Sequence, residues 1–448
     1  MARKIERIST LFQPLKVIPK NATLKGDNLL SNSQKLMLEN GIIRQSGNGM
    51  FHILPLGMKA LEKLIKLVDK EMAKLNAQKV LLPALTDAKL WIKSGRWQTA
   101  GAELFKMKDR HSKEYILSPT HEEAIAALVA SISPVSHHKL PIRMYQISSK
   151  FRDEKKSRFG MIRGKEFIMK DLYTFDQTLP AAKNTYAEVC QAYDKIFGAI
   201  GVSYAKVIGD NGIMGGSLSH EYHFLTKIGE DSLMLCDTCK YGANKEVFEG
   251  ENCPSCKNGK IQEKHGIEVG HTFVLGSSYS APLDATFMDS DGKANPLEMG
   301  SYGLGMTRIL AAAIESLSPA DEIRWPLVLT PYTVCIITPK DGSKEEAASQ
   351  TAYKLYNDLN SINSLRGDVI IDDRGSLTIG KRVLDARKTG YPFIIVVGKK
   401  SLLADPLFEV FDVFKSECLD LRLPDLMDFI SEIVSPRNAN KWKAAVPG

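Results

Sequence analysis

The 448-residue sequence contains no long apolar run, no internal repeat and no low-complexity tract. A membrane-spanning helix needs about 20 consecutive apolar residues, so the sequence predicts a soluble protein without a membrane anchor. Neither a Rossmann fingerprint nor a P-loop is present, so the two best-known glycine-rich phosphate loops are excluded. Hydrophobic residues make up 44% and charged residues 25% of the chain, which is the balance of a globular protein large enough for more than one domain.

Acidic residues are scarce at the start of the chain, where six Lys or Arg stand against Glu6 and Asp27 within residues 1–30. Basic, hydroxyl-bearing and acid-poor termini are typical of organelle transit peptides. Residues 1–30 are therefore interpreted as a transit peptide or a disordered N-terminus. The formal net charge of +7 permits a nucleic-acid partner but does not establish one. At the other end, a loose polar tail is expected over residues 437–448.

Cysteine is also rare, and four of the seven cysteines form two close pairs with 13 residues between them. Two C-x₂-C pairs at this spacing suit a structural zinc ion in a tetrahedral ribbon. Reduced thiols without a metal are the alternative. The predicted zinc-ribbon-like module covers residues 234–262, and its expected ligands are Cys236, Cys239, Cys253 and Cys256.

Hydrophobic periodicity indicates where the helices lie. Residues 58–75 and 181–200 repeat apolar side chains at helical spacing with charged residues opposite. Between them, the apolar run VLLPAL contains Pro83, which cannot donate to a sheet, so this run is expected to be a strand at an edge or an interface. From Pro326 onwards, short apolar strands alternate with helices, which predicts a compact α/β domain over residues 326–436 with a partly parallel sheet.

Residues 149–175 combine twelve charged side chains with large apolar ones. Residues 144–154 and 165–175 are predicted to be two antiparallel strands joined by a basic loop. If Phe167 lies on the same side as Arg152 and Glu154, the hairpin forms a platform for a nucleotide: an arginine for oxyanions, a carboxylate for an amine and a ring for stacking. A salt-bridged surface hairpin is the alternative from spacing alone.

A second segment, GSYGLGMTRILAAAIE, covers residues 300–315 and places Arg308 near the start of a predicted helix. Glycines allow a backbone to approach a ligand closely, and the start of a helix favours an anion. The two segments together favour a site for a phosphorylated ligand.

With these segments side by side, the sequence resembles class II aminoacyl-tRNA synthetases, specifically prolyl-tRNA synthetases of the bacterial and mitochondrial type. GMFHILPLGMKALEKLIKLVDKEM with VLLPAL is similar to motif 1, FRDE with RGKEFIMKD to motif 2, and GSYGLGMTRILAAAIE to motif 3. LSPTHEEAI, GGSLSHEYHF and GIEVGHTFVLG resemble the amino-acid pocket segments of the family. The six segments stand in the family order, and the resemblance runs from about residue 35 to residue 435.

The resemblance implies an α+β fold. A class II catalytic domain over residues 31–325, with an antiparallel sheet and flanking helices, would precede a C-terminal α/β anticodon-binding domain. It further implies a homodimer built through motif 1, and a ligase that joins L-proline to ATP as prolyl-adenylate and then to the 3′ end of tRNA(Pro). The large editing insertion of typical bacterial relatives is missing between Phe175 and Gly300.

By similarity to the family, Arg152 and Arg308 carry the chemistry, with Mg²⁺ balancing the charge of ATP. ATP would be held by Arg152, Glu154, Arg163, Phe167, Glu268, His271 and Arg308. A core histidine within the sheet is the alternative role for His271.

Proline would be held by Thr120, Glu122, Arg152, Phe273 and Ser301. Ser301 departs from the pattern of many bacterial relatives, which have Cys at this position, so the polarity of the pocket is expected to differ. The expected tRNA contacts in the C-terminal domain are Arg374, Lys381, Arg382, Arg387 and Lys388, taken as a group.

The transit-like N-terminus and the missing insertion together predict a protein of the mitochondrial matrix, with the bacterial cytoplasm as the alternative. A non-catalytic synthetase relative, which keeps the fold and binds RNA or DNA as an accessory subunit, is the competing interpretation of function. The presence of Arg152, Glu154, Phe167 and Arg308 favours the enzyme.

Overall fold

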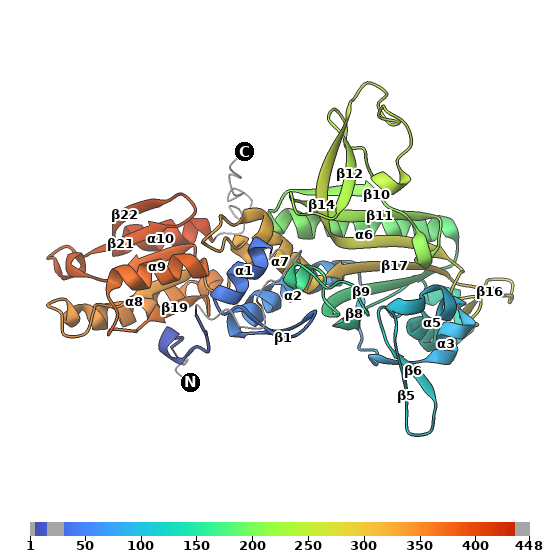
Figure 1. Ribbon diagram of the computed structural model, residues 1–448, viewed down its shortest axis with the longest axis horizontal. Coiled ribbons are helices and arrows are strands. Elements are labelled where there is room, and N and C mark those ends of the chain that lie inside the picture. The colour runs from blue at the N-terminus through green and yellow to red at the C-terminus, as the bar shows by residue number, and fades with distance from the viewer. Residues whose placement is uncertain (1–4, 16–30, 435–448) are drawn as a thin grey trace.

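A computed structural model describes residues 5–15 and 31–434 of the chain (Figure 1). A large N-terminal unit built on a nine-stranded sheet lies beside a smaller C-terminal α/β unit. One continuous apolar core joins them, since Ile314 and Trp325 are in the same buried cluster as Cys335 and Tyr391. Within the described residues, no helix is both long and apolar enough to cross a membrane.

The nine-stranded sheet is antiparallel except where β3 pairs with β8 and β10 pairs with β13. The predicted hairpin is confirmed, because β8 and β9 pair antiparallel with Phe151 opposite Glu166. The strands follow the order β11 (Leu218–Leu225), β10 (Tyr204–Ile208), β13 (Gly242–Asn244), β12 (Asp231–Cys236), β14 (Ile261–Gly276), β17 (Glu298–Gly305), β9 (Glu166–Asp176), β8 (Ile142–Phe151) and β3 (Gln78–Lys79).

Helices cover one face of this sheet (Figure 1). Both helices predicted in this unit are confirmed: α2 buries Leu61, Leu64 and Val68, and α6 begins at a cap in which Thr178 accepts from the Ala181 N–H. The helices on this face are α1 (Asn32–Glu39), α2 (Pro55–Lys74), α6 (Leu179–Ile200) and α7 (Met306–Leu317).

Strand alternation separates the two faces of the sheet. On β9, Lys170 and Leu172 point towards α6, whereas Phe167, Met169 and Asp171 line a cavity on the opposite face. The same alternation holds on β17, whose small residues face the cavity. The helical face therefore supports the strands, and the other face is left for a ligand.

Three small sheets and three short helices surround the open face. The sheets are β1–β2 (Ile43–Gly47, Met50–Ile53), β4–β6–β5 (Leu85–Asp87, Glu114–Leu117, Phe105–Lys108) and β16–β15–β7 (Ala294–Pro296, Thr286–Met288, Val135–Ser136). The helices are α3 (Ala88–Lys93), α4 (Arg96–Thr99) and α5 (Glu122–Ala130). Of these elements, the three helices contribute to the wall of the cavity, through Trp91, Arg96 and Glu122.

The apolar run at residues 80–85 differs from its prediction. Only Gln78–Lys79 and Leu85–Asp87 are strands, and residues 80–84 between them are irregular. Pro83 has no N–H for a ladder, and its carbonyl oxygen instead accepts from His121 at 3.0 Å. Leu81 is 79% exposed, which is a large apolar side chain facing outwards.

The C-terminal unit confirms the predicted α/β pattern. Strand β18 pairs parallel with β19 and β20, and helices α8 and α9 follow β18 and β19. The sequence did not predict the antiparallel strands β21 and β22 or helix α10. Its elements are β18 (Val334–Ile337), α8 (Ser349–Ser361), β19 (Val369–Asp372), α9 (Ile379–Thr389), β20 (Phe393–Val396), β21 (Leu407–Asp412), β22 (Glu417–Arg422) and α10 (Leu423–Ile433).

Residues 5–15, here called the N-terminal strap, lie against the C-terminal unit (Figure 1). The Ile371 N–H on β19 donates to the Glu6 carbonyl oxygen at 3.0 Å, and the Ser9 hydroxyl donates to Asp373 at 2.7 Å. Ile8 is buried in the core between the two units. The interpretation of residues 1–30 as disordered does not fit the strap, because its backbone and apolar side chains have partners.

The strap also reaches the catalytic unit. Gln13 donates to the Asn40 carbonyl oxygen at 3.1 Å, and Arg44 donates to the Pro14 carbonyl oxygen at 2.7 Å. The strap thus contacts both units at once. The remainder of the predicted terminal segments, residues 1–4, 16–30 and the tail at 437–448, lies outside the described residues.

Candidate active site

A cavity of about 400 Å³ opens on the face of the sheet that carries no helices. Strands β9, β14 and β17 form its floor, and α4 and the start of α5 form part of its wall. Nine of the predicted site residues line it: Thr120, Glu122, Arg152, Phe167, Glu268, His271, Phe273, Ser301 and Arg308.

The motif 2 hairpin places an arginine over an aromatic ring. Lys150 pairs with Phe167 across the two strands, so Arg152, two residues further on, emerges on the Phe167 side. The Arg152 guanidinium carbon lies 5.3 Å from the centre of the Phe167 ring. Burial and the nearby Arg308 lower the pKa of Arg152 from its usual value. An anion placed between the two guanidinium groups would relieve this repulsion.

Arg308, in the first turn of α7, is held by the hairpin loop and by β14. Its guanidinium donates to the Ile162 carbonyl oxygen at 2.8 Å and to the Glu268 carboxylate at 3.2 Å. Glu268 also accepts from His271 at 2.9 Å. Burial alone would raise the pKa of Glu268, but His271 and Arg308 outweigh it and hold the pKa well below its usual value. The carboxylate is therefore ionised, and it holds the Arg308 guanidinium and the His271 imidazole in place.

Glu154 and Arg163 are not among the residues that line the cavity. Arg163 donates to Glu154 at 2.8 Å and to Glu230 at 2.7 Å. Both interpretations of this hairpin therefore hold in part. The loop end forms an ion-pair network, and the strand end faces the cavity.

A carboxylate lies at the opposite end of the cavity. Glu122, the first residue of α5, is fully buried and accepts through Oε1 from the hydroxyls of Thr120 and Ser301, each at 2.8 Å. Nearby, the rings of Phe273 and His271 stack with centres 3.9 Å apart. A buried carboxylate beside aromatic surface suits a small ligand that carries a positive charge and an apolar body.

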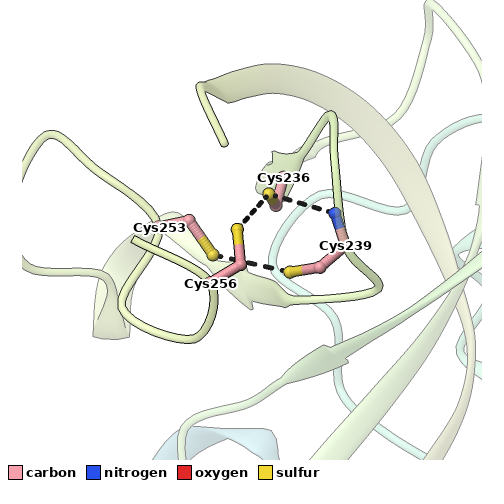
Figure 2. Close-up of side chains that lie close together, drawn as sticks. All are labelled: Cys236, Cys239, Cys253 and Cys256. Carbon is pink, nitrogen blue, oxygen red and sulfur yellow. Dashed lines mark hydrogen bonds between the residues drawn. The ribbon is translucent and has the colours of Figure 1, made fainter. Parts of the chain in front are cut away.

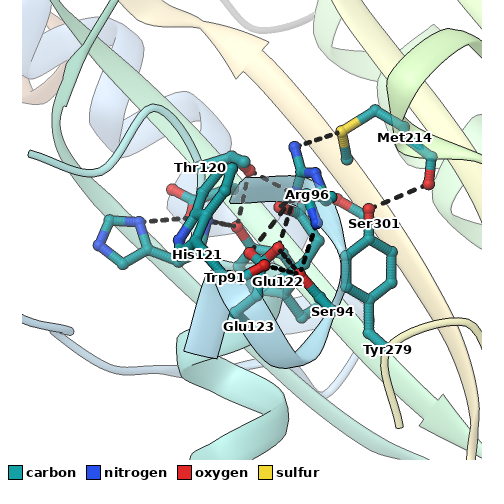
Figure 3. A network of polar contacts seen from close by, with 12 residues as sticks. Trp91, Ser94, Arg96, Thr120, His121, Glu122, Glu123, Met214, Tyr279 and Ser301 are labelled. Atoms are coloured by element: carbon teal, nitrogen blue, oxygen red, sulfur yellow. Dashed lines mark hydrogen bonds and ion pairs between the residues drawn. The ribbon is translucent and has the colours of Figure 1, made fainter. Parts of the chain in front are cut away.

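The sequence did not predict that Arg96 belongs to this site (Figure 3). Its Nη1 atom lies 3.3 Å from Glu122 and 3.2 Å from Glu123, and its guanidinium carbon lies 4.5 Å from the Trp91 ring centre. Glu122 and Glu123 are each more than 25 positions away from Arg96 along the chain, which is beyond the reach of any helical or strand periodicity. The only local signal is an arginine between two tryptophans, in WIKSGRW.

A network of buried polar groups lies next to Glu122 and holds the start of α5 in place. Lys150 pairs with Asp171 at 2.8 Å, and Tyr173 donates to Asp171 at 2.8 Å. The same Tyr173 oxygen accepts from the His121 backbone N–H at 2.9 Å. Because His121 precedes Glu122, this network fixes the start of α5 against β9.

The four paired cysteines meet at the end of the projection formed by β12 and β14 (Figure 2). Their sulfur atoms all lie within 4.8 Å of one another, and two pairs are 3.6 Å apart. Zn–S bonds of about 2.3 Å in a tetrahedron require sulfur atoms about 3.8 Å apart. The donor set therefore fits a zinc ion, as the spacing predicts.

The predicted tRNA contacts cluster on and before α9, but they are not equally accessible. Arg374 pairs with Asp372 at 2.7 Å, and Arg387 with Glu322 at 3.1 Å. Arg382 is fully buried and donates to the Thr338 hydroxyl and the Asp372 carbonyl oxygen. The prediction of RNA contact does not fit Arg382, because its guanidinium is used inside the domain.

Two family models match the chain. The model described as tRNA synthetase class II core domain (G, H, P, S and T) matches residues 105–317, and the model described as anticodon binding domain matches residues 333–433. Over 432 residues, the chain is 46% identical to a relative from Rattus norvegicus named "Probable proline--tRNA ligase, mitochondrial", covering 95% of this chain and 91% of that one. The chain belongs to the prolyl-tRNA synthetase family.

Bacterial members of the prolyl-tRNA synthetase family match as well. A proline--tRNA ligase of Sulfurimonas denitrificans is 35% identical over 449 residues, which cover 96% of this chain and all of that one. A solved structure of the Giardia lamblia prolyl-tRNA synthetase in complex with prolyl-adenylate superposes with a TM-score of 0.77 at 18% identity, covering 93% of this chain and 82% of that one. At this identity the superposition shows a shared fold.

Proposed function

We propose that this chain activates L-proline with ATP to form prolyl-adenylate and then transfers proline to the 3′ end of tRNA(Pro) in the mitochondrial matrix. One observation carries the proposal: Arg152 over Phe167 and Arg308 on α7 face one cavity whose far end holds the buried carboxylate of Glu122. Relatives named as mitochondrial proline--tRNA ligases support both the reaction and the compartment.

In the first step the proline carboxylate attacks the α-phosphate of ATP. The nucleophile is already ionised, so the protein must mainly align the reactants and neutralise charge. Arg152 would bridge the proline carboxylate and the α-phosphate, because no hydrogen bond ties its guanidinium to another described residue. Phe167 would stack on adenine, and Arg308 would hold the outer phosphates.

The other nucleotide contacts require a rearrangement or a bound ion. Glu154 and Arg163 lie outside the lining of the cavity and pair with each other, so a shift of the hairpin loop would have to bring Glu154 to the adenine amine and Arg163 to a phosphate. Mg²⁺ bound to ATP would offset phosphate charge, and the carboxylates of Glu221, Asp231 and Glu268 on the cavity wall provide the oxygen ligands that it prefers.

At the other end of the cavity, Glu122 would pair with the proline ammonium group, with Thr120 and Ser301 holding the carboxylate in place. Phe273, whose opposite ring face is stacked on His271, would contact the apolar ring of proline. Burying an ammonium group is favourable only when the protein replaces the hydrogen bonds that the group made to water. The carboxylate of Glu122 and the hydroxyls of Thr120 and Ser301 provide acceptors for these bonds.

The zinc module and the dimer are proposed on separate grounds. Four sulfur atoms at tetrahedral spacing support a structural zinc ion that would hold together the loops of residues 234–262.

Motif 1 includes exposed Leu81 and Leu85 beside α2, and a second copy of the chain would bury them in a homodimer.

The C-terminal unit, proposed to extend over residues 326–436, would bind the anticodon of tRNA(Pro). Arg374, Lys381, Arg387 and Lys388 form a partly exposed basic group that would contact the RNA backbone. Replacing Lys381, Arg387 and Lys388 together with Ala should raise the KM for tRNA while adenylate formation is unchanged. Equal loss of both activities would contradict this division of labour.

Aminoacylation of a tRNA(Pro) transcript tests the proposed function. Purified protein should attach proline, and not threonine, and the reaction should require ATP. A folded protein that binds tRNA(Pro) but attaches no amino acid would overturn the proposal in favour of an accessory, non-catalytic subunit.

A further inference from the structure

Arg96 and Glu123 surround the carboxylate at the amino-acid end of the cavity, which Arg96 lines and Glu123 does not. Arg96 is 8% exposed and Glu123 is fully buried. Glu123 lies behind Glu122, away from the residues that line the cavity, and its carboxylate accepts from Arg96 at 3.2 and 3.3 Å and from the Ser94 hydroxyl at 2.8 Å. A single guanidinium nitrogen, Nη1, therefore joins the two carboxylates (Figure 3).

The charge of this cluster can be counted from its contacts. Burial opposes the charge of Arg96, but Glu123 and Glu122 outweigh it and raise the Arg96 pKa above its usual value. Burial raises the pKa of Glu123 above its usual value, and Arg96 offsets only part of that rise. Two carboxylates surround a single guanidinium, so the formal charge of the cluster is −1.

Neighbouring groups leave this count unchanged. Lys150 and Asp171 form an internally neutral pair beneath Glu122. Burial and Lys150 lower the pKa of His121, which keeps its imidazole neutral. Burial raises the pKa of Tyr279, so the phenol near Arg96 is also neutral. A buried net charge of −1 is costly unless a cation arrives to balance it.

We propose that Arg96 and Glu123 are positioning residues that set the charge of the amino-acid pocket, so that it accepts one ammonium group. Arg96 cancels one of the two carboxylates and holds Glu122 in place, and Glu123 cancels Arg96 so that Glu122 keeps its full charge for the ligand. This inference rests on the proposed function, since it assigns the ammonium of proline to that place.

Substitutions at Arg96 and Glu123 should compensate for each other. With Arg96→Met, the two buried carboxylates would share one proton, and negative charge would be drawn away from Glu122. With Glu123→Gln, Arg96 would neutralise Glu122, and the pocket would lose its attraction for a cation. The double variant restores a net charge of −1 on Glu122 alone, so its proline affinity should exceed that of either single variant.

Proline-dependent ATP–pyrophosphate exchange, measured with the full-length protein at pH 7.5, tests this prediction. Each single substitution should raise the KM for proline about tenfold or more. The double variant should return to within about threefold of wild type, because the effects of substitutions at contacting residues are not additive. The KM for ATP should stay unchanged in all three. Arg324→Met, which removes an arginine paired with Glu322 at 2.6 Å outside the cavity, is the matched control.

Additive losses in the double variant would overturn the proposal, because they are the result expected of a purely structural cluster. If Arg96→Met does not fold, Arg96→Lys takes its place in the test. Lysine keeps the positive charge but not the geometry of the guanidinium, so this variant should weaken proline affinity less than Glu123→Gln does. A greater loss with Arg96→Lys than with Glu123→Gln would overturn the proposal. Wild-type protein without proline-dependent exchange would instead contradict the proposed function.

Discussion

The guanidinium group of Arg152 lies 5.3 Å from the ring centre of Phe167, on a neighbouring antiparallel strand. The pairing of Lys150 with Phe167 fixes this relationship, because it sets which faces of the two strands coincide. One register therefore places an anion-binding group and a stacking surface side by side. Glu122 and Arg96 line the same cavity from a different wall. A ligand that fills the cavity therefore has the carboxylate of Glu122 at one end and the guanidinium of Arg152 at the other.

The buried amine of Lys170 should make the stability of the protein depend on pH. Burial lowers its pKa to about 7, against an ordinary value of 10.5, and the amine donates to the Tyr302 carbonyl oxygen at 3.0 Å. Between these two pH values the unfolded chain binds a proton that the folded chain lacks, so the free energy of unfolding should rise with pH.

Urea unfolding at pH 6.5, 8 and 9.5 measures this contribution of Lys170. Lys170→Met, which removes the titrating group, should show a smaller rise over this range than the wild type. The same slope in both proteins would show that Lys170 does not carry the effect.

The four-cysteine cluster should hold one zinc ion per chain. Cys239→Ser and Cys253→Ser should each lose the metal, measured by elemental analysis, and should become sensitive to proteolysis within residues 236–256, because the loops would lose their common anchor. Cys418→Ser, at an exposed cysteine outside the cluster, is the control and should keep its zinc. Metal-free wild-type protein with an intact module would contradict the prediction.

The N-terminal strap should stabilise the folded chain. Deleting residues 1–15 removes the Ile371–Glu6 and Ser9–Asp373 hydrogen bonds and exposes the pocket of Ile8, which should lower the free energy of unfolding by about 2–4 kcal/mol. Because Asp373 adjoins Arg374, the KM for tRNA should rise as well. Deleting only residues 1–4 keeps the strap and should have neither effect; an unchanged stability after the longer deletion would refute the role of the strap.

The protein should activate alanine and fail to remove it from tRNA. A pocket shaped for a larger apolar group discriminates against a smaller one by only about 1–3 kcal/mol, and only residues 176–299 separate motif 2 from motif 3. Alanyl-tRNA(Pro) incubated with the protein should therefore hydrolyse no faster than alanyl-tRNA(Pro) alone. Rapid release of alanine would show that an editing site exists within the chain.

Local patterns in the sequence were sufficient for the hairpin of β8 and β9, the helices α2 and α6, and the parallel strands of the C-terminal unit. Each of these elements is specified by periodicity or by residues close together along the chain. The Arg96 cluster and the N-terminal strap were missed because their contacts join distant segments. Ser9, for example, contacts Asp373, which lies 364 positions further along the chain.

Burial also decides which of the predicted site residues can contact RNA or a ligand. Arg382 and Lys381 are neighbours in the same basic segment, yet only Arg382 is enclosed by the domain. Composition cannot distinguish them, because helix periodicity assigns a face to each but does not indicate what packs against it. The same limit applies to Glu154, whose pairing with Arg163 depends on the shape of the loop between the strands.

Amino-acid-dependent ATP–pyrophosphate exchange, compared between wild type and Arg152→Ala, tests whether this cavity forms prolyl-adenylate with the help of Arg152. Wild-type protein should exchange strongly with proline and not with threonine. Arg152→Ala should lose about 100-fold or more of this rate, the usual cost of removing a group that stabilises charge in a transition state. Arg366→Ala, at an exposed arginine of the C-terminal unit, should exchange like the wild type. Undiminished proline-dependent exchange by Arg152→Ala would contradict the assignment of Arg152 and the account built on it.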